Sequence, residues 1–196
     1  MLYTIIKGVA RFLFLFSGLK VEGLNNLPRQ GAVIVAANHV SFWDPVIVAM
    51  VAHRPVHYIA KAELFNNKIL GTLFNKLNAF PVKIGTPDRK AIRYALHLLE
   101  EGKVLGIFPE GTRNRNDEDM KAASGIALFA LKSGAPVVPV ACRGTKRYLP
   151  WIGPRPFVIR FGPAVYFDSN DKKMDSATLE KVSNDIMNKI NSLLVK

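Results

Sequence analysis

Residues 32–52 read AVIVAANHVSFWDPVIVAMVA, and this stretch decides the fold class. Its first part, Ala32–Ala37, is continuously apolar and short, which predicts a buried strand. Polar residues follow, and then Asp44 and Pro45 have the residue types of a helix N-cap and a first helical position. We therefore expect a helix over Pro45–Ala52 and a strand–loop–helix unit, from which α/β domains are built.

The same alternation continues along the chain. Apolar runs predict further strands at Val56–Ala60, Val104–Phe108, Val137–Ala141 and Phe157–Phe161. Helical patterns are found from Asp88 to about Glu101, over Ile126–Lys132, and from about Asp175 onward. The length of 196 residues suits one domain, and no linker marks a second. We expect an α/β fold with a central mixed sheet flanked by helices.

The composition describes a folded and strongly basic chain. Hydrophobic residues make up 49% and charged residues 21%, which excludes general disorder. The net charge is +12, and the stretch from Arg143 to Arg160 contains five basic residues and no acid. Such an excess attracts an anionic partner, which can be a nucleic acid, membrane phosphates or an acidic protein. Cys142 is the single cysteine, so an intramolecular disulfide is excluded, and a reducing compartment is expected.

The first 19 residues, MLYTIIKGVARFLFLFSGL, are apolar but interrupted by Lys7 and Arg11. We expect neither a spanning helix nor a secretory signal peptide, because the uninterrupted apolar run is short and no charged region precedes it. The apolar residues fall at helical spacing: Leu2, Ile5, Ile6, Val9, Phe12, Leu13 and Phe16. Residues 1–20 are interpreted either as a helix in a membrane interface, with its cations near lipid phosphates, or as a helix that packs on the protein's own core.

His39 lies in a loop that follows the first strand, the usual place for ligands in open α/β sheets. Asp44 comes at a spacing that lets the chain bring its carboxylate back to the imidazole. A carboxylate on one ring nitrogen fixes the tautomer, and the other nitrogen can then take a proton from a hydroxyl group. The alternative is an ordinary helix start beside a loop histidine.

A second polar loop, Phe108–Arg113 (FPEGTR), also follows a predicted strand. Gly111 permits a tight turn, Thr112 offers a hydroxyl, and the planar guanidinium of Arg113 suits phosphate oxygens. Glu110 is expected to hold Arg113 or the loop in place. The alternative is a turn with a surface salt bridge. Together the two loops suit a substrate that has both a phosphate and a reactive hydroxyl.

These residues resemble the bacterial 1-acyl-sn-glycerol-3-phosphate acyltransferase family. The family's N-H-x-S-x-x-D motif is matched by Asn38, His39, Ser41 and Asp44, and its F-P-E-G-T-R motif by residues 108–113. A V-P-V strand follows at Val138–Val140, and the resemblance extends from about Val21 to Phe167, within an acyltransferase domain of residues 21–196. The resemblance implies that His39 is the general base and that Asp44 orients it. It also implies a phosphate site of Glu110, Gly111, Thr112 and Arg113.

The resemblance further implies an enzyme of phospholipid synthesis at the cytoplasmic face of the membrane. Its acyl donor would be acyl-carrier protein or acyl-coenzyme A, its acceptor lysophosphatidic acid and its product phosphatidic acid, and it would also contact the anionic membrane surface. We expect no metal, no cofactor and no nucleic-acid partner.

The sequence departs from the family at two positions. Ile84 stands where many relatives have an arginine, and Ala123 where relatives often have a lysine. Isoleucine cannot bind phosphate, so Lys83 or Arg89 is expected to supply the missing cation. The alternative functions are acyl transfer to another lysolipid or to glycerol 3-phosphate, and non-catalytic binding of RNA or membrane by a basic protein.

Overall fold

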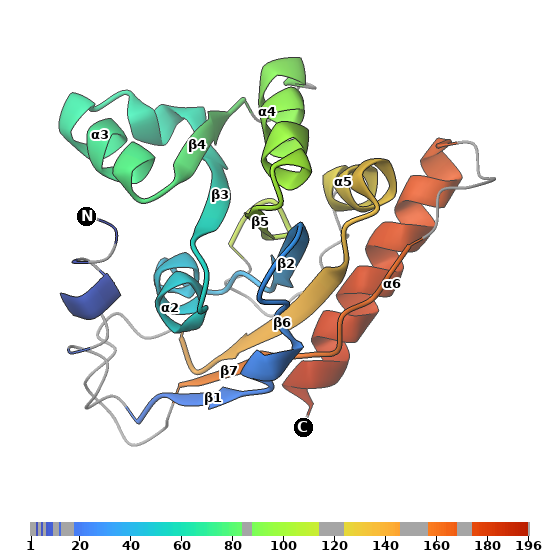
Figure 1. Ribbon diagram of the computed structural model, residues 1–196, viewed down its shortest axis with the longest axis horizontal. Helices are drawn as coiled ribbons and strands as arrows, with labels where there is room; N and C mark the ends of the chain where they lie inside the picture. Colours follow the sequence, from blue (N-terminus) through green and yellow to red (C-terminus); the bar gives the residue numbers. More distant parts are fainter. Residues whose placement is uncertain are drawn as a thin grey trace.

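The computed structural model describes residues 3, 5, 7–9, 12, 18–83, 88–113, 124–145, 157–167 and 174–195. These residues form a seven-stranded sheet in the order β1-β7-β6-β2-β5-β3-β4 (Figure 1). The strands are β1 (Lys20–Glu22), β2 (Val33–Ala37), β3 (Val56–Lys61), β4 (Ala79–Val82), β5 (Val104–Ile107), β6 (Val137–Arg143) and β7 (Val158–Phe161). All neighbouring pairs are parallel except β6 and β7. The predicted mixed α/β sheet is confirmed.

Helices cover both faces of this sheet (Figure 1). They are α2 (Asp44–Val51), α3 (Lys68–Lys76), α4 (Arg89–Glu100), α5 (Gly125–Ser133) and α6 (Ser176–Leu194), with short 3-10 helices η1 (Leu24–Asn26) and η2 (Ala62–Phe65). Alternate residues of the fully buried strand β2 point to opposite faces. Val33 and Val35 pack in the cluster that contains α2, whereas Ile34 and Ala36 pack in the cluster that contains α4, α5 and α6.

The structure adds elements that the sequence patterns did not predict. Strand β1 is three exposed residues, which become a strand because they pair with β7 from the other end of the chain. Helix α3 and strand β4 lie between the predicted strand β3 and the predicted helix α4. Asp44 was predicted as a helix N-cap, but the cap position is occupied by Trp43 and helix α2 begins at Asp44 itself.

The described part of the N-terminal segment contacts the loop between α2 and β3. The Lys7 ammonium donates to the carbonyl of Ala52, and the Val56 N–H donates to the Tyr3 hydroxyl at 3.4 Å. The membrane interpretation of this segment places its cations near lipid phosphates, and Lys7 contacts the protein in the structure. Ile5, Val9 and Phe12 are exposed, whereas Leu2, Ile6, Leu13 and Phe16 lie outside the described residues. No helix among the described residues has the length and hydropathy to cross a membrane.

Candidate active site

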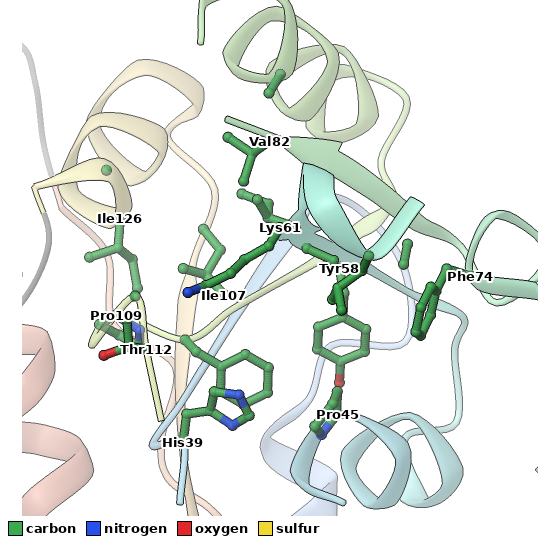
Figure 2. A pocket seen from close by; sticks show the side chains of 18 of the residues that line it. His39, Pro45, Tyr58, Lys61, Phe74, Val82, Ile107, Pro109, Thr112 and Ile126 are labelled. Carbon is green, nitrogen blue, oxygen red and sulfur yellow. The ribbon is translucent and has the colours of Figure 1, made fainter. Parts of the chain in front are cut away.

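The two polar loops meet because their strands are neighbours. Strands β2 and β5 pair in parallel, with Val33 opposite Val104 and Ala36 opposite Ile107, so His39 and Phe108 follow them at the same edge of the sheet. Strand β3 pairs in parallel with β5 on its other side and ends there as well. A cavity of about 980 Å³ opens at this edge, and both loops line it. Figure 2 shows His39, Pro109 and Thr112 on its wall.

His39 and Asp44 form a close, largely buried pair. The His39 Nδ1 lies 3.1 Å from Asp44 Oδ2, and the Asp44 side chain is fully buried. The same oxygen accepts the backbone N–H groups of Val40 at 2.8 Å and Ser41 at 2.6 Å. Asp44 therefore shapes the loop that carries His39 and accepts the Nδ1 proton. This leaves Nε2 as the free nitrogen on a side chain that lines the cavity.

Glu110 joins the second loop to the first. Its Oε2 accepts the backbone N–H of His39 at 3.0 Å, and the side chain is buried. Burial, reinforced by the nearby Asp44 carboxylate, raises the pKa of Glu110 to about 7, although the bond from the His39 N–H opposes the shift. Glu110 was expected to hold Arg113 or the loop in place. It holds the loop that carries His39, while Arg113 is exposed at the cavity.

The Phe108 ring packs against the His39 ring. The two rings stack with their centroids 4.2 Å apart, and Phe108 stacks in turn on Tyr58 at 5.8 Å. Tyr58 lies over Gly106 of β5, where an added Cβ would come within 2.3 Å of the tyrosine ring. A glycine at this position is therefore required for the stack, which holds the imidazole plane in place.

Asn38 ties the same loop to strand β6. Its side-chain amide donates to the carbonyl of Cys142 at 3.0 Å and accepts the Cys142 N–H at 2.7 Å. This reciprocal pair continues the hydrogen bonds between β2 and β6 by one position beyond Ala37. Cys142 is buried, and burial raises the pKa of its thiol, so its surroundings favour an inert thiol over a nucleophile.

Of the predicted phosphate-binding residues, Gly111, Thr112, Arg113 and Lys83 line the cavity, whereas Glu110 does not. Gly111 has a φ of 68° and donates its N–H to the Phe108 carbonyl, which turns the chain tightly and exposes Thr112 and Arg113 at the cavity. Lys83 lines the same cavity from the end of β4. The two positions that depart from the family, Ile84 and Ala123, lie outside the described residues, as do Lys146, Arg147 and Trp151, which were considered as surface contacts for lipid or donor.

Lys61 is a cation that the sequence analysis missed. It ends strand β3 and lines the cavity, and Figure 2 shows its ammonium group pointing inward, toward the side of Ile126 and Thr112. The sequence feature that could have identified Lys61 is its position directly after the predicted strand Val56–Ala60. The carboxyl ends of parallel strands share one edge of the sheet, so that position places the residue beside His39 and Phe108.

The rest of the cavity wall is mainly apolar. It passes from the polar edge between α2 and β3 toward α3, and residues along this part include Val46, Ala49, Met50, Leu64, Phe74 and Leu77. Among the described residues, His, Cys, Asp and Glu side chains do not gather in a group of three or more that could hold a metal. The site thus combines the His39–Asp44 pair, a group of cations and an apolar lining.

Comparison with known proteins assigns the family. The Acyltransferase family model matches residues 18–143, which include both loops and six of the seven strands in full. The chain belongs to the acyltransferase family. The acyltransferase is 40% identical to the 1-acyl-sn-glycerol-3-phosphate acyltransferase of Bacillus subtilis over 67% of this chain and 66% of the relative. It is 31% identical to the enzyme of that name from Streptococcus pneumoniae over 98% of this chain and 73% of the relative.

A solved structure supports the same assignment. The crystal structure of the 1-acyl-sn-glycerophosphate (LPA) acyltransferase PlsC from Thermotoga maritima aligns with a TM-score of 0.76 at 25% identity. The alignment covers 99% of this acyltransferase and 80% of that chain. The predicted fold class and family are therefore confirmed.

Proposed function

We propose that this acyltransferase moves a fatty acyl group from an acyl thioester to the free hydroxyl of 1-acyl-sn-glycerol 3-phosphate, which gives phosphatidic acid. The observation that carries the proposal is one cavity that brings together the His39–Asp44 pair, the Arg113 loop and a long apolar wall. A lysophospholipid acceptor has a hydroxyl, a phosphate and an acyl chain that match these three features. The names of the relatives from Bacillus and Streptococcus point to the same acceptor.

The reaction needs one proton acceptor. His39 Nε2 removes the proton of the acceptor hydroxyl, and the oxygen attacks the thioester carbonyl. A carbon–oxygen bond forms, the carbon–sulfur bond breaks, and the thiolate leaves with the proton returned by His39. Asp44 keeps Nδ1 as the donor and stabilises the imidazolium that forms between the two proton transfers. General-base action of this kind contributes typically ~10²–10⁴ in rate.

The phosphate of the acceptor binds at the cations around the second loop. Arg113 offers a planar fork for two phosphate oxygens, and Lys61 and Lys83 line the same cavity. Lys61 supplies the charge that the family's missing arginine would supply at position 84. The Glu110 carboxyl is buried behind His39 and does not belong to this phosphate site.

The donor is acyl-carrier protein or acyl-coenzyme A, both of which present the thioester on a phosphorylated carrier. The basic surface of the chain suits either donor.

Residues 1–20 associate peripherally with the cytoplasmic face of the membrane, since the described apolar residues Ile5, Val9 and Phe12 are exposed. The acyltransferase domain then comprises residues 21–196.

Acyl transfer by the purified protein tests the proposal. Wild type is incubated with lysophosphatidic acid and palmitoyl or oleoyl thioesters of both donors, beside His39→Ala and a control variant, His97→Ala, on the exposed surface of α4. We expect phosphatidic acid from wild type and His97→Ala, and a loss of at least about 10²-fold for His39→Ala. Formation of product with glycerol 3-phosphate or another lysolipid, and none with lysophosphatidic acid, would contradict the proposed acceptor.

A further inference from the structure

Helix α3 presents apolar side chains to the outside, where a helix on a water-exposed domain presents polar ones. Ile69 is 80% exposed, Leu70 is 45% exposed and Leu73 is 36% exposed. Leu64, on the neighbouring η2, is 41% exposed. These four residues are called the α3 patch. A group of exposed large aliphatic residues on one short segment marks an interaction site.

The orientation of α3 is fixed by its inner face. Gly71 is buried against η2, and a Cβ there would come within 2.9 Å of the Phe65 carbonyl oxygen. Ile69 and Leu73 stand two positions before and after Gly71, so each lies about 160° around the helix from it. The Phe65 and Phe74 rings also pack at 5.8 Å. Turning the helix to bury Ile69 and Leu73 would break this packing, so their exposure belongs to the fold.

The charge around the patch favours an anionic lipid surface. The α3 sequence, KILGTLFNK, has no acid, and its two ends are the exposed residues Lys68 and Lys76. The neighbouring η2 carries one exposed acid, Glu63, so the lysines of α3 outnumber it. Aliphatic side chains flanked by lysines suit the boundary between acyl chains and phosphate groups. A second copy of this chain is a poorer occupant, because two molecules with a net charge of +12 repel each other.

The patch adjoins the cavity of the candidate active site. Leu64, Phe74 and Leu77 line the apolar part of the cavity under α3, and Tyr3 and Lys7 of the N-terminal segment line it as well. Figure 1 shows α3 and the N-terminal segment on the same side of the molecule. We propose that the α3 patch docks on an anionic lipid leaflet, so that a lipid acceptor enters the cavity beside α3. The entry of an acceptor rests on the proposed function; the docking surface is tested without it.

Vesicle flotation tests the docking surface. The double variant Ile69→Ser/Leu73→Ser removes the outermost apolar side chains, neither of which lines the cavity. The matched control is Val195→Ser, which removes an aliphatic side chain that is 88% exposed after the end of α6. With vesicles of phosphatidylcholine and phosphatidylglycerol, we expect the double variant to partition about tenfold more weakly than wild type. The control should bind as wild type does.

Three results would overturn the proposal. One is unchanged vesicle binding by the double variant, and another is absence of binding by wild type. The third is self-association of wild type without lipid that the double variant loses, since this would assign the patch to a second copy. Acyl transfer to detergent-dispersed lysophosphatidic acid separates the two proposals. We expect the double variant to retain it, and its absence in wild type would refute the proposed function without affecting the flotation result.

Discussion

We expect the buried Glu110 carboxyl to make the stability of this acyltransferase depend on pH. Its pKa is raised from 4.5 to about 7 by burial, with a further contribution from the Asp44 carboxylate. A raised pKa in the folded state means that the unfolded chain loses its proton first. The stabilisation is therefore complete below about pH 4.5 and is lost as the pH rises through about 7. The shift corresponds to about 3 kcal/mol of unfolding free energy.

Glu110→Gln removes this titration and keeps an oxygen that can accept the His39 N–H. The unfolding free energy of wild type and variant is measured by urea denaturation at several values between about pH 5 and about pH 8. We expect the difference between them to change by about 2–3 kcal/mol in favour of the variant over this range, since part of the change has already occurred at about pH 5. The control is Glu180→Gln on the exposed surface of α6, which should follow wild type.

Parallel curves for wild type and Glu110→Gln would refute the reasoning, because they would mean that Glu110 stays charged and solvated in the fold. Activity adds a second comparison. Glu110→Gln should retain most of kcat, whereas Glu110→Ala should lose it, since alanine leaves the His39 N–H without its acceptor.

Three further predictions concern the candidate active site and its support. Asp44→Asn should lower kcat by about 10²–10⁴-fold with little change in acceptor KM, since the amide keeps the loop but not the charge behind His39; steady-state kinetics check this, and unchanged kcat would contradict it. Arg113→Ala and Lys61→Ala should each raise the KM for the phosphorylated acceptor more than for the thioester donor, and equal changes for both substrates would remove these residues from the phosphate site. Gly106→Ala should lower the unfolding free energy by about 1–3 kcal/mol in urea denaturation, because its Cβ would overlap the Tyr58 ring; unchanged stability would show that the ring moves freely.

The sequence predicted the elements that carry continuous apolar runs or clear helix signals. Strand β2 is buried along its whole length, so its AVIVAA run was sufficient. Helix α4 was found because Asp88 caps it through the N–H groups of Lys90 and Ala91, and Gly102 ends it with a φ of 71°. The two loops were grouped because their residue types suit one substrate, and the parallel pairing of β2 and β5 brings them together in the structure.

The missed features depend on partners far away in the chain. Strand β1 has only exposed residues and exists through its pairing with β7. Helix α3 was missed although its apolar and polar residues are segregated, because it is only nine residues long and its apolar stripe is exposed and does not form part of the core. The hydrogen bond from the His39 N–H to Glu110 could not be predicted either. It follows from the packing of two loops that are far apart in the chain, and the F-P-E-G-T-R motif alone does not indicate it.

The central claim is that His39 is the base for acyl transfer to lysophosphatidic acid. It is tested most directly by the rate of phosphatidic acid formation in wild type and His39→Ala, with both proteins shown to be folded and at saturating donor. We predict a reduction of at least about 10²-fold in the variant. A variant that forms phosphatidic acid at the wild-type rate would contradict the account.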